Sequence, residues 1–268
     1  MTSFNNSMIE LSLFTSYLSY KNDIWIDDSM NGFNDNPYIN SITTDAIDFL
    51  KNDRKLEHIK IYTKVDENLP NICYIKYENQ VFISFSGIRN TNDILHSLYY
   101  YLSYNDVLDC NIYRGYSNLF NLIIEDVIFL VNKITENEKI DIIFVGHSLG
   151  GVIAKLCSLY FNMNGNNYSC MTYSCPMIGS LSFINKFNEI VPNSFHVCCH
   201  TDPVVRAPFI FNIIEENNKF MFNQEEIVEY SPSYLSYFYN LITMNFYTHR
   251  LLNYYEKFKN KNFTYIKK

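Results

Sequence analysis

The sequence lacks the features that mark membrane-spanning and nucleic-acid-binding chains. No stretch approaches the roughly 20 consecutive apolar residues that a transmembrane helix needs. The formal net charge is −7 and no basic stripe occurs, which argues against nucleic acid as a partner and against electrostatic adsorption to anionic membranes. The first lysine is Lys21, so the N-terminus has no basic region of a signal peptide. We therefore expect a soluble, intracellular protein.

A disulfide framework and a metal-binding pattern are also missing. The chain has 7 cysteines, an odd number, and no Cys-x-x-Cys pair. Most of them fall inside apolar stretches, where a free cysteine behaves as a small hydrophobe, so we predict reduced structural thiols. Residues 27–38 imitate the start of a calcium loop, but Tyr38 stands where a bidentate Glu is required. We interpret this stretch as a solvated loop and expect no metal or organic cofactor.

Length and periodicity predict one α/β domain. The 268 residues are 47% hydrophobic, which is ample for a full core, and neither an internal repeat nor a flexible linker interrupts them. Residues 1–70 are predicted to form a helical or irregular extension. The predicted helices are 8–20, 41–51, 116–134, 152–161 and 181–187, and the predicted strands are 72–77, 81–85, 140–145, 168–173 and 195–199. Strands that alternate with helices indicate a mostly parallel central sheet with helices on both faces.

The most informative motif is Gly-His-Ser-Leu-Gly at residues 146–150. It stands between a predicted strand and a predicted helix, the setting in which G-x-S-x-G forms a nucleophile elbow. The turn is so tight that the positions two before and two after the serine cannot carry bulk, which glycine satisfies. Only 8 glycines occur in the chain, so a chance match is uncommon. Ser148 is therefore the candidate nucleophile.

A serine nucleophile needs a base, and the base needs an acid to orient it. On this fold the chain order is Ser, then Asp or Glu, then His. Asp202 follows the predicted strand 195–199, and Pro203 biases it toward an extended conformation. A turn residue without a catalytic role is the alternative interpretation of Asp202.

The base is identified from the positions of the 6 histidines. Only His249 lies after Asp202, so it is the candidate base, with an ordinary surface histidine as the alternative. His147 lies inside the elbow, where packing or orientation is its expected role. His196 lies in a strand interior and is interpreted as a core histidine, and His200 is too close to Asp202 in sequence to approach Ser148 independently.

Attack on an ester carbonyl creates an oxyanion that needs two N–H donors. The backbone N–H of Leu149, directly after the nucleophile, is the first candidate. The second should come from the loop after an earlier strand, and the strand 81–85 leads to Gly87, which allows close backbone approach, and to Ile88. A plain glycine turn is the alternative interpretation of this loop.

Together these blocks resemble the class 3 (fungal-type) lipase family of α/β hydrolases. The resemblance runs from about residue 70 to 256 and includes the whole elbow hexapeptide 146–151. The other matching blocks are 85–88, 93–95, 115–116, 172–179, 202–208 and 247–249. Two positions depart from the family pattern: Ile88 replaces a Thr or Ser whose hydroxyl supports the oxyanion hole, and Ser86 replaces an Arg. Both departures predict a lower activity.

The resemblance also implies a short lid helix after the oxyanion loop. Here it corresponds to about residues 90–101, with Ile94, Leu95 and Leu98 as apolar groups that a closed lid buries and an open lid presents to lipid. Transient contact with a lipid interface is therefore expected. An ordinary amphipathic surface helix is the alternative.

The function expected from the resemblance is hydrolysis of lipid carboxylic esters, by a triacylglycerol lipase or a phospholipase. Ser148, His249 and Asp202 would form the triad, and the N–H groups of Leu149 and Ile88 would hold the oxyanion. A catalytically weak lipid-binding or regulatory protein on the same fold is the main alternative, and Ile88 is the residue that favours it. A hydrolase of another ester or of a thioester is a third possibility.

Overall fold

The computed structural model describes most of the central part of the chain and shorter pieces at both ends. The described residues are 6–20, 58–62, 69–87, 101–136, 139–199, 201–206, 219–222, 227–229, 249 and 254. The calcium-like stretch 27–38, the predicted helix 41–51, Ile88 and the predicted lid residues Ile94, Leu95 and Leu98 lie outside these ranges.

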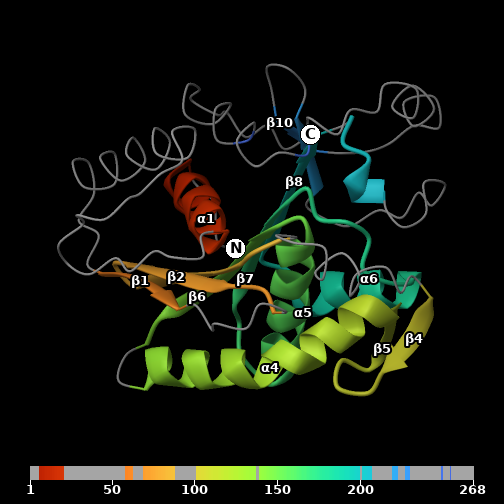
Figure 1. Cartoon of the computed structure of the whole chain (residues 1–268), viewed down its shortest axis with the longest axis horizontal. Coiled ribbons are helices and arrows are strands. Elements are labelled where there is room, and N and C mark those ends of the chain that lie inside the picture. Colours follow the sequence, from red (N-terminus) through yellow and green to blue (C-terminus); the bar gives the residue numbers. More distant parts are fainter. Residues whose placement is uncertain are drawn as a thin grey trace.

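An eight-stranded sheet forms the centre of the fold, in the order β1-β2-β3-β6-β7-β8-β9-β10 (Figure 1). The strands are β1 (His58–Tyr62), β2 (Ile72–Tyr77), β3 (Gln80–Phe85), β6 (Asp141–His147), β7 (Ser169–Tyr173), β8 (Ser194–Cys199), β9 (Lys219–Phe222) and β10 (Ile227–Glu229). The strands from β3 to β9 run parallel, while β1 with β2, β2 with β3, and β9 with β10 pair antiparallel. The prediction of an α/β fold with a mostly parallel sheet is confirmed.

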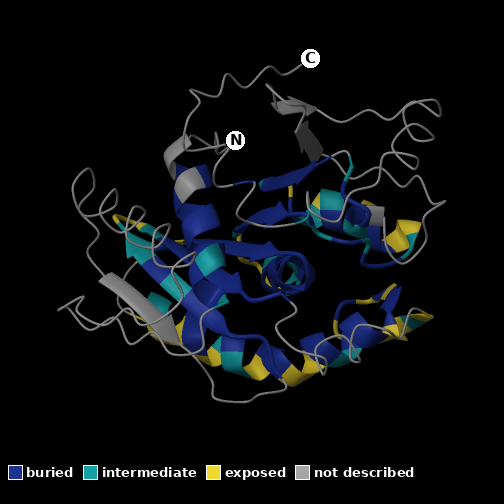
Figure 2. Cartoon of the chain, turned by 45° about the horizontal axis from the view of Figure 1, so that its top comes forward, coloured by how far each residue is buried: buried dark blue, intermediate teal, exposed yellow. Residues whose placement is uncertain are grey.

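Helices cover both faces of this sheet (Figure 1). On one face lie α4 (Arg114–Thr135), α5 (Leu149–Met163) and α6 (Leu181–Ile190), and on the other lies α1 (Asn6–Ser19). Figure 2 shows α5 and the central strands as buried, because α5 is enclosed between the sheet and the neighbouring helices. Within the described ranges, no helix is both long and apolar enough to cross a membrane.

The periodicity of β6 sorts its side chains between two cores. Ile142 and Phe144 belong to the core beneath α4, α5 and α6, whereas Ile143 and Val145 belong to the core beneath α1. Successive side chains of a strand point to opposite faces of the sheet. His147, the last residue of β6, is therefore directed to the face that α1 covers.

The strongest periodic patterns correspond to observed elements. The predicted helix 116–134 is α4, the helix 152–161 is the middle of α5, and the helix 8–20 is α1. The sequence did not predict β1, which lies within residues 1–70 and pairs with β2, nor β9 and β10. It also missed a small separate hairpin, β4 (Leu102–Asn105) with β5 (Cys110–Tyr113), which leads directly into α4. That the whole chain forms a single domain stays a prediction.

All seven cysteines are free, and all except the half-buried Cys175 are buried. Burial raises the pKa of the Cys73 and Cys157 thiols well above the ordinary value, which keeps them protonated. This burial agrees with the interpretation of these cysteines as small apolar side chains.

Candidate active site

Ser148 stands in a sharp turn between a strand and a helix. β6 ends at His147 and α5 begins at Leu149, with Ser148 between them at φ 57° and ψ −127°. A residue with a side chain rarely adopts a positive φ, and holding one there costs on the order of 1–3 kcal/mol. Two backbone hydrogen bonds hold the turn: the Ser148 N–H donates to the Tyr173 carbonyl over 3.0 Å, and the Ser148 carbonyl accepts the Gly151 N–H over 3.0 Å.

Gly146 and Gly150 make this turn sterically possible. A Cβ on Gly146 would lie 2.1 Å from the carbonyl oxygen of Gly150, and a Cβ on Gly150 would lie 2.0 Å from the carbonyl oxygen of Phe85. Both obstacles are backbone atoms, which cannot rotate away as a side chain could. The two glycines therefore let β6, the start of α5 and the end of β3 meet at one point.

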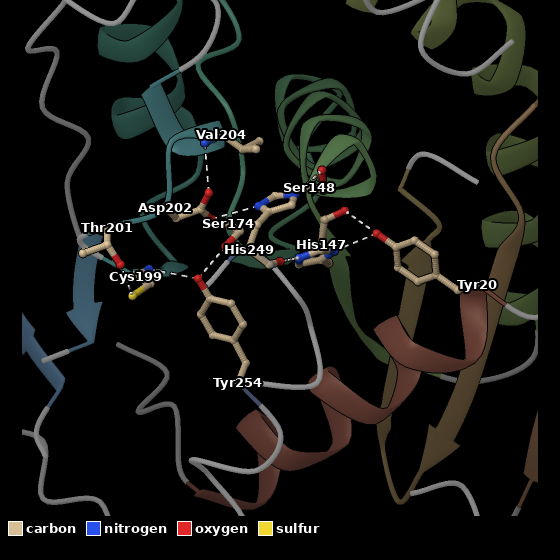
Figure 3. A network of polar contacts seen from close by, with 10 residues as sticks. All are labelled: Tyr20, His147, Ser148, Ser174, Cys199, Thr201, Asp202, Val204, His249 and Tyr254. Carbon is tan, nitrogen blue, oxygen red and sulfur yellow. Dashed lines mark hydrogen bonds and ion pairs between the residues drawn. The ribbon is translucent and has the colours of Figure 1, made fainter. Parts of the chain in front are cut away.

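The structure brings Ser148, His249 and Asp202 together although they are far apart in the sequence (Figure 3). His249 Nε2 lies 2.9 Å from Ser148 Oγ, and His249 Nδ1 lies 2.8 Å from Asp202 Oδ2. A carboxylate can only accept, so Nδ1 carries the proton and donates a hydrogen bond to Asp202. Nε2 is then the acceptor for the Ser148 hydroxyl, which is the orientation a general base requires.

Asp202 is held in a fixed position beneath the imidazole. Its side chain is fully buried, its Oδ1 accepts the Val204 N–H over 2.9 Å, and its own N–H donates to the Cys199 carbonyl over 3.1 Å. A buried carboxylate needs hydrogen bonds to both oxygens, and here the ring of His249 supplies the second one. The arrangement can stabilise an imidazolium that forms at His249.

His147 lies beside the site rather than in it. Its ring centre is 4.8 Å from that of His249, its Nε2 lies 2.7 Å from the His249 carbonyl oxygen, and its Nδ1 lies 2.7 Å from the Tyr20 hydroxyl. Burial, and then the nearby His249 ring, lower the pKa of His147 to about 3. His147 is therefore neutral at physiological pH, so it can donate through one ring nitrogen and accept through the other.

Tyr254, five positions after His249, is held by two hydrogen bonds. Its hydroxyl accepts the Cys199 N–H over 2.9 Å and shares a short hydrogen bond with the Ser174 hydroxyl. Its side chain is buried, and this burial, together with the Asp202 charge, raises the pKa of Tyr254 well above its ordinary value. Tyr254 is thus fixed to the ends of β7 and β8. Sequence reasoning missed Tyr254, because no periodicity singles it out among 23 tyrosines.

Of the two candidate oxyanion donors, only Leu149 is among the described residues. Leu149 is the first residue of α5, where a backbone N–H has no acceptor within the helix and carries the positive end of the helix dipole. Ile88 lies outside the described residues, which end at Gly87 on this side of the gap. Ser86, two positions before Ile88, is fixed by a reciprocal pair: its Oγ accepts the Asn71 N–H over 2.8 Å and its N–H donates to the Asn71 carbonyl over 3.0 Å.

The remaining histidines take no part in this geometry as far as the structure describes them. His196 is buried in β8, and its Nδ1 lies 2.8 Å from the Thr172 hydroxyl oxygen. This agrees with its interpretation as a core histidine. His200 lies outside the described residues.

Comparison with known proteins agrees with this fold and motif. The family model described as lipase (class 3) matches residues 82–212. A secreted mono- and diacylglycerol lipase of Fusarium solani is 26% identical over 103 residues, which is 38% of this chain and 31% of that protein. A lipase of Caenorhabditis elegans is 32% identical over 80 residues, which is 28% of this chain and 23% of that protein. The aligned parts thus span less than a third of either relative.

Solved lipase structures are similar to this chain in fold although their sequences differ widely from it. The mono- and diacylglycerol lipase from Aspergillus oryzae superposes with a TM-score of 0.69 over 92% of this chain and 96% of that one, at 11% identity. The Rhizomucor miehei lipase in its propeptide complex superposes with a TM-score of 0.64 over 93% of this chain and 81% of that one, at 16% identity. At such identities the likeness describes the fold alone.

Proposed function

Because the chain belongs to the class 3 lipase family, we propose that it is a serine hydrolase that cleaves lipid carboxylic esters. The observation that carries the proposal is the hydrogen-bonded series from Ser148 Oγ through the His249 ring to the buried Asp202 carboxylate. That series supplies a nucleophile, a base and an orienting acid in the order that acyl transfer needs.

The proposed reaction has two steps. Ser148 Oγ attacks the ester carbonyl carbon while its proton passes to His249 Nε2, and the resulting oxyanion is held by the Leu149 N–H and, as the sequence predicts, by the N–H of Ile88. The tetrahedral intermediate collapses, the imidazolium gives its proton to the leaving alcohol, and an acyl-enzyme remains. Water activated by His249 then releases the carboxylic acid and restores the Ser148 hydroxyl. No metal or organic cofactor is required for these steps.

The substrate class rests on the relatives rather than on a pocket. The relative in Fusarium solani is described as a secreted mono- and diacylglycerol lipase. Partial acylglycerols therefore join triacylglycerols and phospholipids as candidate substrates. The lid predicted at Ile94, Leu95 and Leu98 remains a sequence-based proposal, and higher turnover of aggregated than of monomeric esters would support it.

The test of the proposed function combines covalent labelling with turnover. A fluorophosphonate probe should label the wild-type chain and should not label Ser148→Ala, while Ser182→Ala, an exposed serine at the start of α6, should label as the wild type does. Hydrolysis of mono-, di- and triacylglycerols and phospholipids, with products resolved by mass, then identifies the substrate. Asp202→Asn should lower kcat by about 10⁴-fold, because an amide no longer fixes the Nδ1–H tautomer of His249.

The alternative is a weakly catalytic lipid-binding or regulatory protein. The observation that favours it is Ile88, which cannot supply the side-chain hydrogen bond that a Thr or Ser supplies in the family. A folded wild-type chain that binds lipid vesicles but never takes up the fluorophosphonate would support this alternative and contradict the proposed hydrolase. Turnover confined to short soluble esters would instead indicate a hydrolase of other esters or thioesters.

A further inference from the structure

Tyr20, directly after α1, makes contacts at the base of the candidate active site (Figure 3). Its hydroxyl lies 2.7 Å from His147 Nδ1 and 3.4 Å from the His147 carbonyl oxygen, and the two rings are 5.8 Å apart. α1 packs against the face of the sheet to which His147 is directed. The end of an N-terminal helix thereby reaches the residue that precedes the nucleophile.

Hydrogen bonds link the Tyr20 hydroxyl to the His147 ring and the His147 ring to the His249 carbonyl. The donor and the acceptor of each bond follow from the groups present. The His249 carbonyl oxygen can only accept, so the 2.7 Å contact with His147 requires the proton on His147 Nε2. With that nitrogen protonated in a neutral ring, Nδ1 is an acceptor, and the Tyr20 hydroxyl is its donor. The lowered pKa of His147 agrees with a neutral ring.

The hydrogen bonds that begin at Tyr20 end on the backbone carbonyl of the proposed base, His249. Asp202 and Ser148 hold the ring of His249, whereas His147 holds its carbonyl group, so that residue is fixed at two separate points. A shift of about 1 Å in a catalytic group can cost on the order of 10²-fold in rate. Losing the contact to the carbonyl would allow such a shift without removing any reacting atom.

The same hydroxyl also lies against the strand end that leads to the predicted oxyanion loop. A Cβ on Gly87 would be 2.1 Å from Tyr20 Oη and 3.0 Å from the His147 carbonyl oxygen. Tyr20 therefore occupies the space beside Gly87, immediately before Ile88. One side chain contacts both the residue that precedes the nucleophile and the start of the oxyanion loop.

We propose that Tyr20 and His147 are positioning residues for ester hydrolysis: Tyr20 fixes the tautomer of His147, and His147 holds the backbone of His249 in line with Ser148. The inference rests on the proposed function for its catalytic consequence. Its structural part, the tautomer and the contact to the His249 carbonyl, stands on geometry alone.

The kinetic test uses substitutions that remove single groups from the full-length chain. Tyr20→Phe deletes only the hydroxyl and should lower kcat for a soluble ester about tenfold while KM stays within about twofold, because binding is untouched and alignment is lost. Tyr160→Phe, in the last turn of α5, is the matched control and should behave as the wild type does. His147→Phe should lose more activity than His147→Gln, because the amide side chain of Gln keeps an N–H donor. A Tyr20→Phe enzyme with wild-type kcat would overturn the proposal.

A second measurement does not depend on activity. Nitrogen-15 NMR of the imidazole groups should show His147 neutral with its proton on Nε2, and Tyr20→Phe should shift the resonances of both His147 and His249. A proton on Nδ1 of His147, or unchanged His249 resonances in Tyr20→Phe, would refute the positioning role. If the wild type neither turns over esters nor labels with a fluorophosphonate, the proposed function fails. The NMR measurement still tests whether the hydrogen bonds from Tyr20 through His147 to His249 exist.

Discussion

The hydroxyl groups of Ser174 and Tyr254 share a buried hydrogen bond across 80 positions of the sequence. Ser174 follows β7 with φ 49°, a left-handed conformation that glycine adopts freely and that costs other residues about 1–2 kcal/mol. Ser174 carries a side chain in this conformation, so its backbone is strained. The bond to Tyr254 offsets that strain and fixes the side chain of Tyr254.

Substitutions at Ser174 should separate the strain from the hydrogen bond. Ser174→Ala loses the bond and keeps the strained backbone, whereas Ser174→Gly loses the bond and relieves the strain. We expect Ser174→Gly to be the more stable of the two by about 1 kcal/mol in urea-induced unfolding. Tyr254→Phe leaves the Cys199 N–H and the Ser174 hydroxyl without their partner and should cost about 1–3 kcal/mol. An alanine variant as stable as the glycine variant would show that position 174 carries no strain.

The glycines of the elbow should tolerate no side chain. In Gly150→Ala the new Cβ meets the Phe85 carbonyl oxygen at 2.0 Å, so β3 and α5 must separate and Ser148 must move. We expect loss of fluorophosphonate labelling and a fall in the midpoint of thermal unfolding. Gly165→Asn is the control, because Gly165 has φ 89° but nothing within 4 Å of its Cβ position, and asparagine tolerates positive φ. Normal labelling of Gly150→Ala would contradict the steric argument.

Patterns of short range in the sequence predicted much of the fold. The apolar spacing of 116–134 predicted a helix now seen as Arg114–Thr135, and the motif 146–150 predicted the turn between β6 and α5. Chain order placed Asp202 and His249 with Ser148, and in the structure these side chains lie within hydrogen-bond distance. Such features could be predicted because each depends on local spacing or on the order of a few residues.

Long-range contacts that neither a motif nor a rule of chain order marks could not be predicted. The contacts of Tyr20 with His147 and of Ser174 with Tyr254 span 127 and 80 positions, and no local pattern distinguishes these tyrosines from the others. The strands β4, β5, β9 and β10 are three or four residues long, too short for an alternating pattern to be recognised. β1 was missed for a similar reason, because its five residues take their strand conformation by pairing with β2.

Cysteine reactivity should separate one thiol from the other six. Cys175 is half-buried, whereas the rest are buried, and thiols react only as accessible thiolates. In the native protein an aromatic disulfide reagent should therefore modify about one thiol. In Cys175→Ser this modification should be lost. In denaturant all seven should react. Fast modification of several thiols in the native state would show that the core opens readily. Fewer reactive thiols than expected in denaturant would indicate a disulfide.

The stability of the fold should fall in mild acid because of His147. Its pKa is lowered from 6.5 to about 3, first by burial and then by the His249 ring, so between these values the unfolded chain binds a proton here and the native chain does not. Stability rises with pH wherever the unfolded state binds more protons. His147 therefore leaves stability undiminished above about pH 6.5 and reduces it by about 1.4 kcal/mol per pH unit as pH falls toward 3.

The comparison of wild type with His147→Gln isolates this contribution. Both chains keep His249, Asp202 and every other ionisable group, so the titration of those groups affects both pH profiles. Between about pH 7 and about pH 5 the wild type should lose about 2 kcal/mol more unfolding free energy than the variant does. The two free energies are measured by urea denaturation at each pH. Equal losses would mean that His147 takes up a proton in the native state, and the neutral ring that donates to the His249 carbonyl would then be excluded.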